Sequence, residues 1–433
     1  MRLEVTLNNF RNQRVIIHAK HDSISICLNH FNNSLNFDRE GRMISIFLNG
    51  HTFQRSEDNR YLVKWKTDKL GSPLTMRRSL EFKEVEEFYS NAQETVHDVL
   101  EALQQQKMKD LIEQHVPVGE AKAVQEWMQR ILSYNLDRYA DRAKEFLQIY
   151  KPISILPPDQ YRSLVVQGTE GCHYNQCTFC AFYRDREFRI KTPTEFRKHL
   201  KNIRRYYGES LRLRRTIFLG DANALVTPQK TLLKFLDAIN EEFDITPAGM
   251  EKEDRTLWKK AHPIHFNGIV SFMDSFSTKQ KSVDDFKEMA ARNLKRVYIG
   301  VETGSDPLLA FLNKPGRSED IREAVEHVKK ANLAVGLIIM VGIGGMKFNA
   351  EHIEKTVKLL RSLPLTDHDL IYFSEFVQLP EMAYTSKAME ERIRPLSPTQ
   401  IKTQMTMMRQ QLRANHPVPP AKLSIYDVRD FMY

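Results

Sequence analysis

Strands and helices are predicted to alternate through a long central part of the chain, and this alternation constrains the fold most strongly. Six short apolar runs, each typical of a buried strand, follow one another with helical patterns between them. They are residues 163–168, 215–221, 268–274, 296–304, 334–345 and 369–378. Apolar strands that alternate with helices favour a parallel sheet covered by helices. When such a sheet curls into a partial barrel, the active site lies at the carboxyl ends of its strands.

The residues outside this alternation show other patterns. Five short, partly alternating segments, broken by Asn and Gly turns, predict a small antiparallel β domain near the start of the chain. Apolar residues at three- and four-residue steps then predict helices, and a Pro-rich stretch at 151–161 marks a boundary. The last residues, AKLSIYDVRDFMY, favour packing as a final strand. We therefore divide the chain into a β domain (1–78), a helical segment (79–150), a partial (β/α)6 barrel (151–395) and a C-terminal extension packing on the barrel (396–433).

The composition bears on the possible partners of the protein and on its location in the cell. The formal net charge of +9 is compatible with nucleic acid or another anionic partner, but a solvated basic surface is the favoured explanation. Four cysteines, three of them close together, do not resemble the disulfide framework of a secreted protein. No apolar run after Met1 is typical of a signal peptide, and no stretch is long enough for a membrane span. We expect a reducing cytoplasmic location.

The segment GCHYNQCTFC follows the first predicted strand of the alternating region. It carries Cys172, Cys177 and Cys180, whereas the remaining cysteine, Cys27, lies in another predicted domain. A structural zinc site needs four ligands, so zinc would require His173 or a distant residue in addition. An iron–sulfur cluster of four irons is usually held by four cysteines, so three would leave one iron open to a small molecule. The spacing favours the iron–sulfur site and leaves the zinc site as the alternative.

Polar residues and glycines follow several of the other predicted strands. Asp221 and Asn223 follow the second strand, and a carboxylate there suits an ammonium group or caps a turn. Glu302 ends an otherwise apolar strand, where burial without a partner would be costly. The other candidates are Ser271 at the end of the third strand, Gly304 at the end of the fourth and Gly342 at the exit of the fifth. Because the carboxyl ends of parallel strands share one face, these residues are predicted to meet near the cysteines.

The cysteine segment, the six β-α steps and the strand-end residues together resemble the radical S-adenosylmethionine (SAM) enzymes. The resemblance covers roughly residues 160–380. It implies that the three cysteines hold a [4Fe–4S] cluster and that SAM chelates the fourth iron. It further implies that an electron from the cluster cleaves SAM to a 5′-deoxyadenosyl radical, which takes a hydrogen atom from an organic substrate. The commonest family spacing is three residues and then two, whereas this chain has four and then two.

The resemblance also implies roles for individual residues. Phe179, directly before the last cysteine, is expected near the SAM adenine, Asp221 and Asn223 near its amino group, and Glu302 near its ribose. Ser271, Gly304 and Gly342 are expected to let the protein approach the cofactor closely. An external electron donor such as flavodoxin or ferredoxin is implied, while the substrate stays open.

A non-catalytic function is the main alternative. The segment AFYRDREFRIK interleaves Arg184, Arg186 and Arg189 with aromatic residues, and such interleaving can bind phosphates and stack bases. The alternative is therefore a zinc- or cluster-stabilised module that binds nucleic acid.

Overall fold

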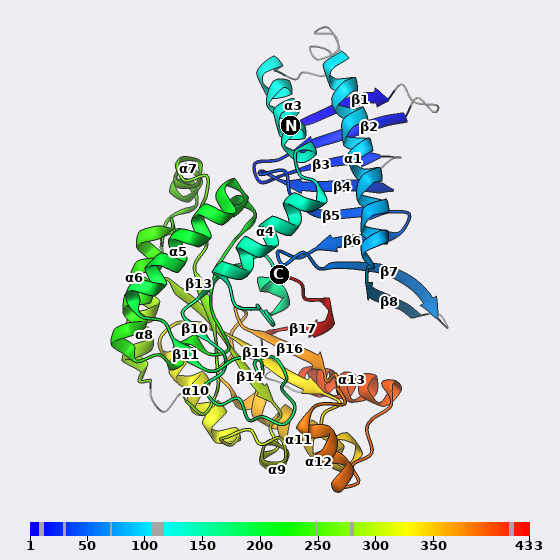
Figure 1. Cartoon of the computed structure of the whole chain (residues 1–433). Helices are drawn as coiled ribbons and strands as arrows, with labels where there is room; N and C mark the ends of the chain where they lie inside the picture. Colours follow the sequence, from blue (N-terminus) through cyan, green and yellow to red (C-terminus); the bar gives the residue numbers. More distant parts are fainter. Residues whose placement is uncertain are drawn as a thin grey trace. The chain divides into compact units, whose positions relative to one another are not determined.

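The protein forms two compact units, each described separately below (Figure 1). The computed structural model describes residues 1–7, 13–28, 32–69, 72–105, 117–247, 249–277, 281–414 and 420–433. The first unit comprises Met1–Lys151, Ile203–Arg214 and Met432–Tyr433. The second comprises Pro152–Asn202 and Arg215–Phe431.

An antiparallel meander of eight strands forms the sheet of the first unit. Its strands are β1 (Arg2–Leu7), β2 (Gln13–Ala19), β3 (Ser23–Leu28), β4 (Asn33–Asp38), β5 (Met43–Leu48), β6 (His51–Arg55), β7 (Tyr61–Lys69) and β8 (Ser72–Ser79). The predicted antiparallel sheet is confirmed, but three of its strands, β4, β6 and β8, were not expected. Asn and Asp in β4 and the partly exposed, mostly polar residues of β6 weaken the strand pattern, so pairing with neighbours decides their conformation.

In the described part of this unit, three helices accompany the sheet: α1 (Phe82–Gln105), α3 (Val118–Leu132) and α4 (Leu136–Ile149). Each has an apolar stripe, and their buried side chains join those of the sheet in one hydrophobic cluster. Asn135 caps α4 by accepting a hydrogen bond from the backbone N–H of Arg138 at 2.8 Å. The predicted helical character of this region is therefore present in the described residues.

A buried ion pair lies at the end of β4. The guanidinium of Arg42 donates from Nε to Asp38 Oδ2 at 2.9 Å, and the two side chains are only 2% and 7% exposed. Ser210 donates to the same oxygen at 2.5 Å, and Arg42 also donates to the carbonyl of Tyr207 at 3.3 Å. The pair therefore fixes the segment Ile203–Arg214 within the first unit.

Seven parallel strands form the sheet of the second unit. In spatial order they are β9 (Leu164–Gln167), β12 (Ile217–Gly220), β13 (Ile269–Met273), β14 (Leu294–Glu302), β15 (Ala334–Val341), β16 (Leu370–Glu375) and β17 (Lys422–Tyr426). β9 and β12 are buried at every position, as parallel strands covered on both faces require. The six predicted β-α steps and the parallel sheet are confirmed.

The C-terminal segment contributes the seventh strand, β17, which pairs with β16 at one edge of the sheet. The last two residues differ from the expected packing on the barrel, because they belong to the first unit. There the ring of Tyr433 lies 6.2 Å from the rings of Phe146 and Tyr150, and its carbonyl accepts a hydrogen bond from the backbone N–H of Glu57. Aromatic packing in the first unit explains the difference.

Helices link the strands of the second unit and lie along its sheet (Figure 1). They are α5 (Pro193–Tyr207), which continues into the first unit, α6 (Gln229–Glu242), α7 (Lys252–Ala261), α8 (Val283–Ala291), α9 (Asp306–Phe311), α10 (Ser318–Lys330), α11 (Gly345–Ser362), α12 (Ala383–Glu390) and α13 (Pro398–Ala414). A two-stranded ribbon, β10 (Thr169–Glu170) with β11 (Arg189–Ile190), closes the long loop after β9. The side-chain oxygen of Thr192 caps α5 by accepting a hydrogen bond from the backbone N–H of Glu195. Among the described residues, no helix combines the length and apolar character needed to cross a bilayer.

His352 of α11 is fully buried beneath the end of β15. Its Nε2 lies 3.1 Å from the carbonyl of Met340 and its Nδ1 lies 2.7 Å from the hydroxyl of Thr303. Burial lowers the pKa of His352 to about 4. The folded protein therefore holds this imidazole neutral at pH values where the unfolded chain protonates it.

We expect this histidine to make the protein less stable as the pH falls from about 6.5 to about 4. In that range the unfolded state binds the extra proton, so the free energy of unfolding decreases by about 2–3 kcal/mol on His352's account. Unfolding measured at pH 7 and pH 4.5 should show a smaller decrease for His352→Gln than for the wild type. His368→Gln, at a side chain that is 83% exposed, is the matched control and should follow the wild type.

Candidate active site

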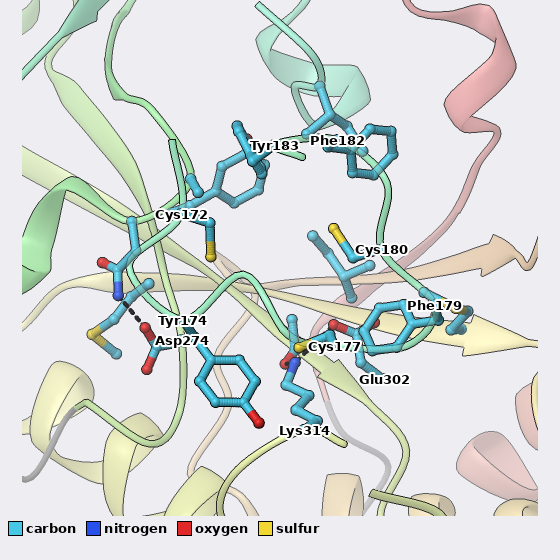
Figure 2. A pocket seen from close by; sticks show the side chains of 18 of the residues that line it. Cys172, Tyr174, Cys177, Phe179, Cys180, Phe182, Tyr183, Asp274, Glu302 and Lys314 are labelled. Atoms are coloured by element: carbon cyan, nitrogen blue, oxygen red, sulfur yellow. Dashed lines mark hydrogen bonds and ion pairs between the residues drawn. The ribbon is translucent and has the colours of Figure 1, made fainter. Parts of the chain in front are cut away.

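One pocket lies at the carboxyl ends of the parallel strands (Figure 2). The loop after β9 supplies one wall, and residues at or after the ends of β12, β13 and β14 supply the facing wall. The lining residues are Ile155, Cys172, His173, Tyr174, Cys177, Phe179, Cys180, Phe182, Tyr183, Ala222, Asn223, Phe272, Met273, Asp274, Phe276, Gly300, Glu302, Lys314, Ile338, Met340, Ser374, Tyr426 and Val428. Most are apolar or aromatic, so the few charged groups among them stand out.

All three clustered cysteines line this pocket. Figure 2 shows the sulfur atoms of Cys172, Cys177 and Cys180 around a shared space, and none of them is in a disulfide. Burial raises the pKa of Cys177 to about 12 and also raises the pKa of Cys180. Both are therefore neutral thiols at pH 7 unless a cation occupies the space between them. In the described part of the chain, no three His, Cys, Asp or Glu side chains gather closely enough to hold a single metal ion.

A buried ion pair forms the floor of the pocket beside Cys177. Lys314 donates from Nζ to Glu302 Oε1 at 2.8 Å and to the carbonyl of Gly300, and the side chains are 7% and 10% exposed. Burial alone would lower the pKa of Lys314, but the Glu302 carboxylate raises it above its usual value. Lys314 thus places a cation in a pocket whose lining is mostly apolar or aromatic. Glu302 has a left-handed backbone, with φ of 59°, which turns the chain at the end of β14.

A second polar corner lies across the pocket, after β12 and β13. Asp274 accepts hydrogen bonds from the side-chain amide of Asn223, the dashed contact in Figure 2, and from the backbone N–H of Ser277 at 2.6 Å. His173 Nε2 lies 3.5 Å from Asp274 Oδ2. The rings of His173 and Tyr174 lie 5.6 Å and 5.5 Å from that of Phe276. This corner offers hydrogen-bonding groups against an aromatic wall.

Residues 166–360 match the family model of the radical SAM superfamily. The matched part contains the cysteine loop, the strand ends after β12 and β13, and both partners of the Glu302–Lys314 pair. Residues 166–360 are a radical SAM domain. Members of this family are enzymes that use a [4Fe–4S] cluster and SAM. The predicted family and fold class are confirmed.

Two curated proteins are similar to part of this chain. A 4′-phospho-dehydrooxetanocin synthase from Priestia megaterium is 25% identical over 217 residues, which cover 47% of this chain and 27% of the synthase. A putative methylthiotransferase from Helicobacter pylori is 33% identical over 92 residues, which cover 21% of this chain and 22% of that protein. The chain therefore spans well under half the length of these relatives.

Solved structures with a similar arrangement include two radical SAM enzymes. The cobalamin-dependent S-adenosylmethionine radical enzyme OxsB aligns with a TM-score of 0.36 and 16% identity, over 57% of this chain and 31% of OxsB. Coproporphyrinogen III oxidase (HemN) from Escherichia coli aligns with a TM-score of 0.37 and 14% identity, over 64% of this chain and 57% of HemN.

The structure brings six of the ten predicted site residues of the radical SAM domain into the pocket lining. They are the three cysteines, Phe179, Asn223 and Glu302. Asp221 lies outside the lining and is engaged elsewhere: its carboxylate accepts from Arg186 at 3.1 Å and from the backbone N–H of Gly171 at 3.1 Å. Burial raises the pKa of Asp221 to about 7, although Arg186 opposes that shift. Through Gly171 and Arg186, Asp221 therefore helps to hold the loop that carries the cysteines.

The other three predicted residues also lie outside the lining and serve in packing. Ser271 is fully buried and donates to the carbonyl of Leu219 at 2.8 Å, which joins β13 to β12. A Cβ at Gly304 would lie 2.5 Å from the carbonyl oxygen of Lys355, so glycine permits α11 to approach. Gly342 has φ of 87°, and its backbone N–H donates to Gln404 of α13 at 2.7 Å.

The arginines on which the nucleic-acid alternative depends are engaged within the protein. Arg186 donates to Pro152 and Asp221, and Arg189 forms ion pairs with Glu170 and Glu195. Arg184 donates to backbone carbonyls of the cysteine loop. Because these side chains already bond within the protein, they do not favour a phosphate-binding surface.

Of the polar pocket residues, Lys314, Asp274 and Tyr174 were not singled out by the sequence analysis. Lys314 follows α9 rather than a strand, so its position in the chain gave no signal. Asp274 ends the strand FMD, and the same strand-end reasoning that selected Glu302 could have selected it. Tyr174 lies within the cysteine segment and had no assigned use, and its neighbour His173 was considered only as a possible zinc ligand.

Proposed function

We propose that this protein is a radical SAM enzyme in which Cys172, Cys177 and Cys180 hold a [4Fe–4S] cluster and SAM occupies the remaining space of the same pocket. The arrangement of the three thiols is the observation that carries the proposal. They surround a common space instead of converging on one point, which suits three corners of a cluster better than a single zinc ion. When bound, the cluster and SAM supply reductive cleavage of the sulfonium and removal of a substrate hydrogen atom, with methionine and 5′-deoxyadenosine as products.

The residues around the thiols fit a charged, adenine-bearing cofactor. Phe179 offers a ring for the adenine, and Glu302 offers carboxylate oxygens to hydroxyl groups of the ribose. Lys314 supplies a fixed positive charge suited to a carboxylate. Asn223 and Asp274 offer acceptors to an ammonium group at the opposite corner. The apolar remainder of the wall keeps water away from the reacting atoms.

The substrate is proposed only as an organic molecule with a removable hydrogen atom. The electron that reduces the cluster is proposed to come from a small electron-transfer protein such as a flavodoxin or ferredoxin. Apart from the three clustered cysteines this sequence has only Cys27, which is too few for a second cluster. Reduced cysteines in a metal loop also suit a cytoplasmic location.

Reductive cleavage of SAM tests this function. Protein reconstituted under anaerobic conditions is expected to hold about four iron and four sulfide per chain and to form 5′-deoxyadenosine from SAM with a strong reductant. Cys177→Ala should lose both properties, because it removes a ligand from the pocket. Cys27→Ala is the matched control: Cys27 is buried in β3, so this variant should keep cluster and product formation. Equal behaviour of the two variants would sink the proposed function.

A further inference from the structure

The gap of four residues between Cys172 and Cys177 has no explanation in the function proposed above. His173 and Tyr174 line the pocket, whereas Asn175 lies outside its lining. Asn175 has a left-handed backbone, with φ of 47°. Asparagine tolerates this conformation better than most residues do. The turn allows the backbone N–H of Asn175 to donate back to the sulfur of Cys172 at 3.4 Å.

Arg184 spans the outside of this turn. Its planar guanidinium donates from Nη2 to the carbonyl of Cys177 at 2.9 Å and from Nε to the carbonyl of Cys180 at 3.3 Å. Nη1 donates to the carbonyl of Asn175. One side chain therefore holds two of the three cysteine residues and the left-handed residue in a fixed relation.

Asn175 also connects the turn to the residue before Arg184, through its own side chain. Its side-chain amide donates to the carbonyl of Tyr183 at 2.9 Å, directly before Arg184. Tyr183 is buried, so the end of the loop that carries Arg184 is fixed by packing. The other end is held independently, because the backbone N–H of Thr178 donates to the carbonyl of Leu312 at 2.9 Å.

We propose that Arg184 and Asn175 form a clamp that positions Cys177 and Cys180 for the cluster, and that the one residue by which this gap exceeds the commonest family spacing makes room for the clamp. This inference rests on the proposed function for its consequence, since the clamp prepares the loop to receive a cluster. Arg184 is a positioning residue: it acts through backbone carbonyls and touches none of the pocket's reacting space. Its fork of donors, more than its charge, performs the task, because three carbonyls in different directions need several N–H groups in one plane.

Amide hydrogen exchange of the cluster-free full-length protein tests the clamp directly. In Arg184→Gln, exchange at the amides of Asn175 and Cys180 is expected to be about 10-fold faster than in the wild type, because the turn loses its bonds to the guanidinium. The amide of Thr178, anchored on Leu312, should be unchanged. Arg184→Lys should resemble Arg184→Gln, since an ammonium cannot reproduce the planar fork. Arg189→Gln removes a neighbouring arginine whose ion pairs, with Glu170 and Glu195, lie outside the segment from Cys172 to Cys180, and it should match the wild type.

Iron binding gives the second measurement. Affinity for the cluster, measured as iron retained against a chelator after anaerobic reconstitution, is expected to fall about 10- to 100-fold in Arg184→Gln and Arg184→Lys, and not in Arg189→Gln. Unchanged exchange in Arg184→Gln, or full rescue of exchange and iron retention by Arg184→Lys, would overturn the clamp. A wild-type protein that takes up no iron would instead refute the proposed function, and the exchange result would still decide the clamp.

Discussion

Replacement of Lys314 by methionine is expected to lower the free energy of unfolding by about 3–5 kcal/mol. The substitution keeps most of the volume of the side chain but leaves Glu302, which is 10% exposed, without its cation. A buried charge that loses its partner costs several kcal/mol, because the remaining protein groups replace its hydration poorly. The carbonyl of Gly300 loses its donor at the same time.

Chemical denaturation of the single and double variants measures this effect. Lys314→Met combined with Glu302→Gln should recover most of the lost stability, since no unpaired charge then remains. Lys287→Met, at an exposed lysine that pairs with Asp284, is the control and should change stability by less than about 1 kcal/mol. A Lys314→Met protein as stable as the control would show that the Glu302–Lys314 pair does not stabilise the fold.

Replacement of Arg42 by methionine is expected to have an effect of similar size on the first unit, about 3–5 kcal/mol. Asp38 would keep the hydroxyl of Ser210 as a donor but lose the guanidinium, in a place where its side chain is 7% exposed. The carbonyl of Tyr207 would also lose a donor. Because Tyr207 belongs to the segment Ile203–Arg214, the variant loses contacts that stabilise both the end of β4 and that segment.

Thermal unfolding followed by circular dichroism checks this expectation. Arg60→Met provides the control: Arg60 also pairs with an aspartate, Asp58, but its side chain is 67% exposed, so the melting temperature should stay near that of the wild type. Arg42→Met should melt well below both. Equal melting temperatures for the two variants would mean that the buried pair contributes no more than an exposed one.

The sequence predicted the architecture of the second unit well because its strands are apolar and buried. β9 and β12 have no exposed position, so a continuous apolar run identified them. β4 and β6 of the first unit were missed because their Asn, Asp, His and Gln residues give no such run. No periodicity in the sequence shows that Ile203–Arg214 belongs to the first unit. Contacts distant in sequence hold the segment there, such as the hydrogen bond from Ser210 to Asp38, the partner of Arg42.

The same limit applies to the pocket. The cysteines and Glu302 were found because their chemistry is unusual for their places in the chain. Asp221 resembled Glu302 in sequence, yet Arg186, 35 positions away, engages its carboxylate in the folded protein. Lys314 was missed for the opposite reason: its partner, Glu302, is known only once the loop after α9 is placed. Partners distant in sequence decide which strand-end carboxylate faces the pocket.

We propose that the three cysteines hold a cluster whose remaining iron is open to SAM. Electron paramagnetic resonance of the reduced, reconstituted protein tests it most directly. We predict the signal of a [4Fe–4S] cluster and a change in that signal when SAM is added, because SAM would bind the iron that lacks a cysteine. A protein that holds zinc and shows no such signal, or a cluster signal that SAM leaves unchanged, would contradict the account.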